Sequence, residues 1–146
     1  MTITIFKDIK STNQPFYREV EVILNRIREG ASKELVKKIR AEKDKTQKNL
    51  YKQNLPAVCF SGKFTKRNDN SLEEHSGLIC LDFDGYKSNK DLLQEKERLS
   101  KNKFIFSVFI SPSGKGLKAL VKIPNDPDNH KSYFLSLQSF FSPPFS

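Results

Sequence analysis

Two aspartates, Asp82 and Asp84, stand at the end of an apolar run and are the side chains best suited to metal chemistry. The run, residues 78–83, reads as a strand, and residues two apart on a strand leave the same face of a sheet. Carboxylates on one face repel each other unless a cation lies between them. Such oxygen ligands suit Mg²⁺ or Mn²⁺, with nucleotide phosphates completing the coordination shell. The pattern predicts a metal site, although Asp84-Gly85 is also ordinary turn chemistry.

A second candidate is the glycine-rich turn at residues 111–116, between two further apolar runs. Glycines allow backbone N–H groups to approach a phosphate closely, and the nearby lysines add charge. The spacing is not that of a Walker A loop, and a strand follows it rather than a helix. Taken alone, the pattern favours an ordinary glycine-containing hairpin, but it follows the carboxylates by one helix and one strand. The residues predicted to bind a nucleotide phosphate are Ser113, Gly114, Lys115, Gly116 and Lys118.

Basic residues suggest a polyanionic partner. The chain carries a net charge of +9, and affinity for nucleic acid depends on Lys and Arg neutralising phosphates. Lys63, Lys66 and Arg67 follow one apolar run and are candidates for contacting nucleic acid, or form only a solvated loop. The charged stretch at residues 40–49 is either a solvated helical face or a phosphate-contacting surface. His75 either begins a strand or has a functional role.

The elements that must position these residues predict an α+β fold: a mainly antiparallel sheet with helices packed on one face, preceded by an N-terminal helical segment. Alternation predicts a strand over residues 2–9, and apolar runs predict strands over residues 57–64, 78–83, 104–110 and 117–123. Helical spacing and capping residues predict helices over residues 20–29, from Ser32, from Ser88 and from Asn129. We expect a single domain over 1–146, with strand and helices in 1–54 and a β-rich core in 55–146.

Composition limits the class of protein. Apolar residues make up 36% and charged residues 29% of 146 residues, which suits one folded domain. No window of 18 or more apolar residues and no signal peptide occur, so we expect a cytoplasmic protein without a membrane partner. Cys59 and Cys80 lie inside apolar runs and are expected to be buried thiols rather than zinc ligands.

The order of strand, Asp-x-Asp, helix, strand, glycine-rich turn and strand resembles the primase-polymerase superfamily of archaeal and eukaryotic primases. The resemblance implies an RRM-like core, with Asp82 and Asp84 as catalytic residues holding Mg²⁺ or Mn²⁺. It also implies that residues 114–118 contact an incoming nucleoside triphosphate. Lys118 stands where that family usually has His, which keeps a positive charge but loses the directional imidazole contact.

Three blocks, residues 55–62, 75–84 and 111–118, look like the VirE-type N-terminal domain, found in front of primase- and helicase-like proteins of bacterial mobile elements. The resemblance implies nucleotidyl transfer in DNA replication on a DNA or RNA template, with a fused or associated helicase-like domain. A third acidic motif and an arginine-containing strand should follow the last helix. Residues 142–146 end the sequence before either, which implies a C-terminally truncated member whose enzymatic activity is left open.

Two alternatives use the same residues differently. A non-catalytic nucleic-acid-binding module would rely on residues 33–48 and 63–67, and its binding would be sensitive to salt and indifferent to metal. A phosphatase of the haloacid-dehalogenase type also begins with an apolar strand and Asp-x-Asp-Gly. Tyr86 stands where that family has Thr or Val, and its later acidic pair is missing.

Overall fold

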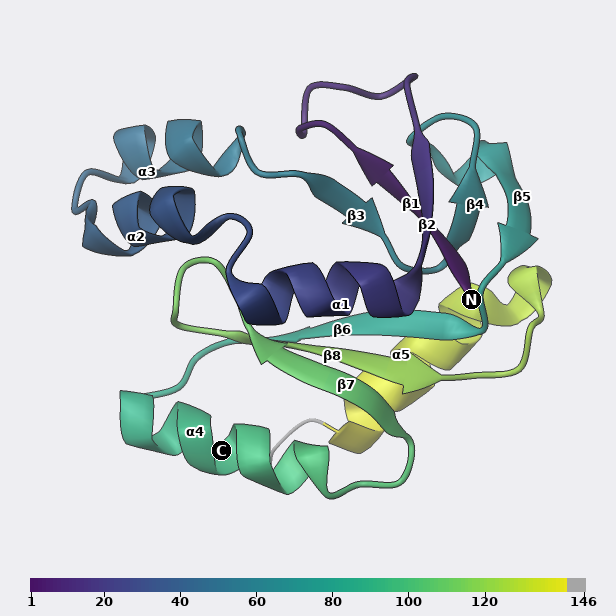
Figure 1. Cartoon of the computed structure of the whole chain (residues 1–146). Helices are drawn as coiled ribbons and strands as arrows, with labels where there is room; N and C mark the ends of the chain where they lie inside the picture. Colours follow the sequence, from purple (N-terminus) through teal and green to yellow (C-terminus); the bar gives the residue numbers. More distant parts are fainter. Residues whose placement is uncertain (142–146) are drawn as a thin grey trace. The chain divides into compact units, whose positions relative to one another are not determined.

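A computed structural model describes residues 1–141, so the prolines expected to end the last helix, within residues 142–146, lie outside the described residues. The chain divides into two compact units, Met1–Ser76 and Gly77–Ser146. Both contain helices and antiparallel strands (Figure 1), which confirms the predicted α+β class. The expected division between residues 54 and 55 falls within the first unit, and the single-domain arrangement stays a prediction.

The first unit contains two small antiparallel sheets and three α-helices. Its three-stranded sheet has the order β2-β1-β3, and β4 pairs with β5. The strands are β1 (Thr2–Phe6), β2 (Phe16–Glu19), β3 (Ala57–Cys59), β4 (Gly62–Phe64) and β5 (Leu72–His75). The helices are α1 (Val20–Glu29), α2 (Lys33–Ala41) and α3 (Lys45–Lys52).

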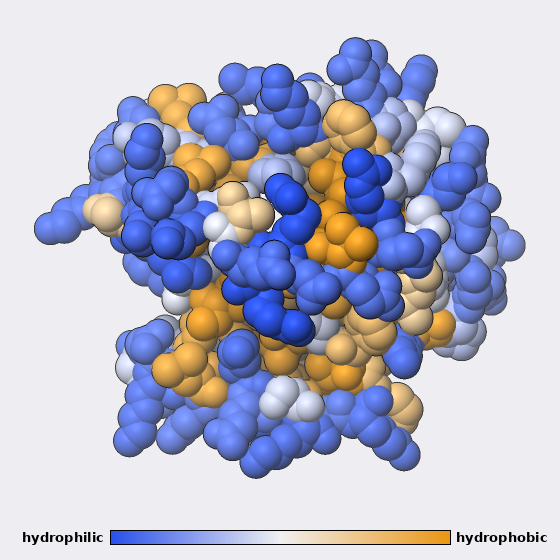
Figure 2. All heavy atoms as spheres, viewed as in Figure 1, coloured by the Kyte–Doolittle hydropathy of each residue, from blue (hydrophilic) through white to orange (hydrophobic). Residues whose placement is uncertain are grey.

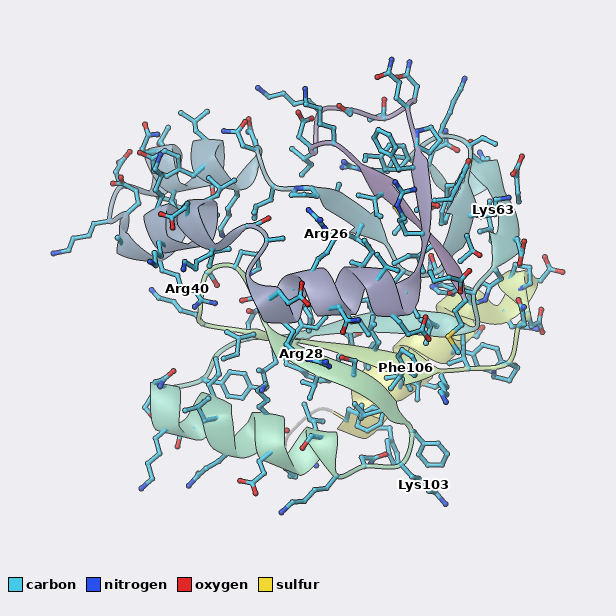
Figure 3. The ribbon with its side chains drawn as sticks, in the orientation of Figure 1. Arg26, Arg28, Arg40, Lys63, Lys103 and Phe106 are labelled. Carbon is cyan, nitrogen blue, oxygen red and sulfur yellow. The ribbon has the colours of Figure 1, made fainter. Side chains whose placement is uncertain are left out.

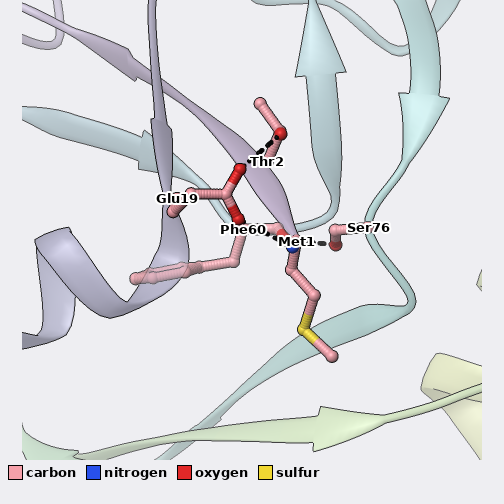
Figure 4. Close-up of polar contacts among 5 residues, drawn as sticks. All are labelled: Met1, Thr2, Glu19, Phe60 and Ser76. Atoms are coloured by element: carbon pink, nitrogen blue, oxygen red, sulfur yellow. Dashed lines mark hydrogen bonds and ion pairs between the residues drawn. The ribbon is translucent and has the colours of Figure 1, made fainter.

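The start of the chain is tied to the end of β2. The Met1 ammonium donates a hydrogen bond to Glu19 Oε2 at 2.9 Å, and Thr2 Oγ1 donates to Glu19 Oε1 at 3.0 Å (Figure 4). Both bonds stabilise the ionised Glu19 carboxylate, so the pKa of this carboxyl lies below its usual value. In the same close-up, Ser76 Oγ donates to the Phe60 carbonyl at 2.5 Å, which fixes the last residue of the unit.

The second unit is one antiparallel sheet with the order β6-β8-β7 and helices on one face. Its elements are β6 (Leu78–Phe83), α4 (Asn89–Ser100), β7 (Ile105–Ile110), β8 (Leu117–Lys122) and α5 (His130–Phe141). Alternate residues of β6 and β8 point into a core that also receives side chains from both helices. The buried members are Ile79, Leu81, Phe83, Leu92, Leu99, Leu117, Ala119, Val121 and Phe141.

Burial of this alternate set decides which side chains remain for function. Leu81 and Phe83 point into the core, so Asp82 between them must leave the opposite face. The same rule turns Leu117 and Ala119 inward and Lys118 outward. No helix within residues 1–141 is long and apolar enough to cross a membrane.

Candidate functional site

Asp82 and Lys118 form an ion pair across two neighbouring strands. In the antiparallel register of β6 and β8, these residues lie directly opposite each other. Lys118 Nζ donates to Asp82 Oδ1 at 2.8 Å. The Asp82 side chain is 61% exposed and that of Lys118 33% exposed, so a ligand can reach both. Exposed pairs of this kind contribute only up to about 1 kcal/mol, so a stronger ligand can displace one.

Lys118 stays charged in this setting. Burial alone would lower the pKa of its ammonium group, but the hydrogen bond and charge of Asp82 oppose burial and leave the pKa above its usual value. Asp84 adds a smaller contribution of the same sign. The site therefore places the Lys118 ammonium group close to two acidic side chains, an arrangement able to meet both a cation and an anion.

Asp84 lies against the glycine-rich turn. Phe83 pairs with Leu117, so the residue after β6 comes opposite Gly116, the residue before β8. A Cβ atom added to Gly116 would lie 2.3 Å from Asp84 Oδ1 and 2.9 Å from the Phe83 carbonyl oxygen. Only glycine permits this approach, and the approach brings the acidic strand end beside the turn.

Hydrogen bonds within the turn satisfy most of its backbone N–H groups. The N–H of Gly114 donates to the Ser111 carbonyl at 2.9 Å, and the N–H of Gly116 donates to Ser111 Oγ at 3.2 Å. The N–H of Lys115 donates to Ser113 Oγ at 3.3 Å. A phosphate at this turn would therefore meet serine hydroxyls and lysine side chains before it meets backbone N–H groups.

Ser111 is the residue of this site that sequence reasoning missed. Its hydroxyl accepts from Gly116 and lies 3.1 Å from the Ser113 hydroxyl, so it holds the turn closed at its base. The available signal was a serine at the end of a predicted strand, two residues before another serine and a glycine, because such hydroxyls commonly bond turn backbone.

The predicted metal site consists of the Asp82 and Asp84 carboxylates, and the Lys118 ammonium group already pairs with Asp82. No group of three or more His, Cys, Asp or Glu side chains within the described chain could hold a metal ion. Two carboxylates still fit Mg²⁺, which commonly uses one or two of them and takes its other ligands from water and phosphate. Lys118 occupies Asp82 Oδ1, so a metal there would use Oδ2 or release the lysine.

The residues predicted to contact nucleic acid lie in the first unit. Lys63 projects from β4 (Figure 3), and its Nζ lies 5.0 Å from the centre of the Tyr17 ring. Arg67 Nη1 donates to the Ile9 carbonyl at 2.8 Å, and the Lys66 side chain is exposed. His75 lies on β5 opposite Gly62 and is buried.

Comparison with protein families finds a match to the BT4734-like, N-terminal domain over residues 50–140. The matched segment includes the Asp82 strand and the 111–116 turn. None of the curated proteins and none of the solved structures compared with the chain matches it. The predicted VirE-type domain and primase-polymerase membership is wrong, because the matching family is a different one. Since the match spans more than half of the sequence, this chain belongs to the BT4734-like N-terminal domain family.

Proposed function

We propose that the second unit binds the phosphate groups of a nucleoside triphosphate together with Mg²⁺ or Mn²⁺. The observation that carries the proposal is that Asp82 pairs with Lys118 and Asp84 lies beside Gly116 of the serine-glycine turn, where β6 ends and β8 begins. Carboxylates attract the cation, and the lysine attracts the phosphates that accompany it.

Lys118 is the residue that changes partner in this proposal. Without ligand its ammonium group neutralises Asp82 across the strands. When a nucleotide binds, the ammonium group turns to a phosphate oxygen, and the Asp82 carboxylate becomes available to the cation. The exchange keeps every charge paired. Its cost in free energy is small, because an exposed ion pair contributes little stability. Lys115, which is exposed on the turn, adds a second positive charge.

Nucleotidyl transfer is the reaction that such a site would serve. A bound divalent ion would stabilise charge on the α-phosphate and lower the pKa of an attacking hydroxyl group. Asp82 and Asp84 would orient that ion, while Lys118 and the serine hydroxyls would hold the triphosphate. The cytoplasmic location expected from the sequence is part of this proposal, because it supplies the nucleotide.

The direct test is titration of a fluorescent ATP analogue, with Mg²⁺, with Mn²⁺ and with a chelator. We expect binding that requires metal and that weakens about tenfold or more in Asp82→Asn, Asp84→Asn and Lys118→Gln. Asp128→Asn is the matched control, because Asp128 is an exposed aspartate of the same unit outside this site. Equal affinity with and without the chelator would contradict the proposal. Equal affinity in the three site variants and the control variant would contradict it as well. Primer extension with Mn²⁺ then tests transfer.

A second candidate function, nucleic-acid binding without catalysis, is favoured by the charge of α2 and α3. Lys33, Lys37 and Arg40 follow one side of α2, and Lys45, Lys48 and Lys52 follow one side of α3, at helical spacing. We call these six residues the basic stripes. Arg40 projects from α2 in Figure 3, and the surface over both helices is mostly hydrophilic in Figure 2. This function predicts an affinity for nucleic acid that falls as the salt concentration rises and that does not depend on divalent metal.

A further inference from the structure

A pocket of about 350 Å³ lies in the first unit, beside the end of α3 and along β3. Its lining includes Ile9, Lys52, Leu55, Val58, Cys59 and Arg67. The volume is at the lower end of the range for small-molecule sites, roughly 300–1,000 Å³. It would hold a ligand about the size of a single nucleotide, and the nucleotide site proposed at Asp82, Asp84 and Lys118 uses none of these residues.

Two cations and no carboxylate line this pocket. Arg67 is held in place, because its Nη1 donates to the Ile9 carbonyl and its backbone N–H donates to the Thr12 carbonyl, both at 2.8 Å. A guanidinium group has five N–H donors in a rigid fork, so one bond to the Ile9 carbonyl restrains the group and leaves donors for a ligand. Lys52 adds an exposed ammonium group from the last residue of α3.

The rest of the lining is apolar and incompletely covered. Ile9 is 47% exposed, and Leu55 and Val58 are half-buried. Covering such side chains with an apolar group is favourable, because it removes apolar surface from water. The pocket thus combines a restrained guanidinium group, an exposed ammonium group and an apolar wall, which is the chemistry that recognises an organic anion.

We propose that this pocket binds an organic anion whose phosphate or carboxylate group contacts Arg67 and Lys52 and whose flat apolar body covers Ile9 and Leu55. Binding here needs no metal, unlike binding at Asp82 and Asp84. The anion comes either from a free small molecule or from one nucleotide of a strand. Lys52 also ends a basic stripe, which would bring a strand's phosphates to the pocket.

The test uses Cys59 as a reporter, because it lines the pocket and is a free thiol. The full chain is alkylated with iodoacetamide in the presence of a chelator, and mass spectrometry follows Cys59 and Cys80 separately. Burial raises the pKa of the Cys59 thiol, so mildly alkaline solution is used to obtain a measurable rate. The probes are phenyl phosphate, inorganic phosphate and a short oligothymidylate.

We expect phenyl phosphate to slow alkylation of Cys59 severalfold while leaving Cys80 unchanged. Inorganic phosphate should protect Cys59 less, because it lacks the apolar body. If oligothymidylate protects Cys59 at a lower concentration than phenyl phosphate does, the bound anion belongs to a nucleic-acid strand. If phenyl phosphate protects at the lower concentration, the bound anion is a free small molecule. Equal protection by phenyl phosphate and inorganic phosphate, or protection by neither phenyl phosphate nor oligothymidylate, would overturn the proposal.

Variants separate a binding role from a structural one. Arg67→Gln should raise the concentration for half protection about tenfold, and Arg67→Lys should recover part of the loss. Lys52→Gln provides an independent variant, because Lys52 is exposed at a helix end and its replacement should not affect folding. Lys7→Gln, an exposed lysine outside the pocket, is the control. Unchanged protection in both Arg67→Gln and Lys52→Gln would contradict the proposed anion contact.

Discussion

At the scale of single residues, Gly116 controls the candidate nucleotide site. Its Cα lies so near the end of β6 that an added Cβ would come within 2.9 Å of the Phe83 carbonyl oxygen and 2.3 Å of Asp84 Oδ1. The carboxylate can rotate away, but the carbonyl belongs to the strand and cannot. Sequence reasoning placed Gly116 among the phosphate contacts, whereas the geometry gives it a further role in allowing the two chain segments to approach.

Gly116→Ala should therefore destabilise the chain by about 2 kcal/mol, the usual cost of forcing an extra carbon into a packed position. Gly114→Ala is the matched control in the same turn. Gly114 has φ +77°, so alanine there should cost about 1 kcal/mol of backbone strain. Urea unfolding of the two variants measures both costs. A Gly116→Ala protein as stable as the native chain would show that β6 and the turn do not approach this closely in solution.

At the scale of elements, α4 shows what a side-chain cap contributes. Ser88 Oγ accepts the N–H of Asp91 at 3.1 Å, as the spacing of these residues predicts. Ser32 stands in the same position before α2, but its side chain makes no cap hydrogen bond. The two serines thus form a natural pair for comparison within one chain.

Ser88→Ala should cost about 1 kcal/mol of stability, because it leaves an N–H of the first turn of α4 without its cap. Ser32→Ala should change stability by no more than a few tenths of a kcal/mol, since the side chain makes no cap hydrogen bond there. Thermal or urea unfolding measured on both variants checks the difference. Equal losses would mean that Ser32 also caps its helix in solution.

Sequence patterns predicted the second unit better than the first, for a physical reason. Most side chains of its strands are buried or half-buried, so the strands stand out as apolar runs, and these runs predicted β6 at its observed bounds, residues 78–83, and β7 and β8 to within a residue. In the first unit, β2 and β5 have few buried residues, so no apolar run indicated them. The strand predicted over residues 57–64 is two short strands with a turn between them.

The candidate site was predictable as a set of residues but not as an arrangement. Asp82, Asp84 and Lys118 could be selected because their types and their places beside apolar runs are visible in the sequence. The ion pair between Asp82 and Lys118 depends on the register of β6 against β8, which joins residues 36 positions apart. Register follows from how the strands pack and from the connection between them, so local patterns do not specify it.

At the scale of the whole molecule, charge is unevenly distributed along the chain. Residues 33–52 contain eight Lys or Arg side chains and three acidic ones, so this short segment supplies more than half of the net charge of +9. Nucleic-acid binding through the net charge of the chain and binding through a local surface predict different effects of removing lysines. If nucleic acid binds only through net charge, removing any four lysines should have the same effect.

The basic stripes predict a local effect. Replacing Lys33, Lys37, Lys45 and Lys48 with Gln should weaken binding to duplex DNA and reduce the slope of log affinity against log salt by about 3.6, because each of the four lost phosphate contacts removes roughly 0.9. The control replaces four exposed lysines of the second unit, Lys87, Lys90, Lys101 and Lys103, and lowers the net charge equally. It should leave the slope nearly unchanged. Fluorescence anisotropy across a salt series measures both variants, and equal reductions would show that net charge, not the surface of α2 and α3, drives binding.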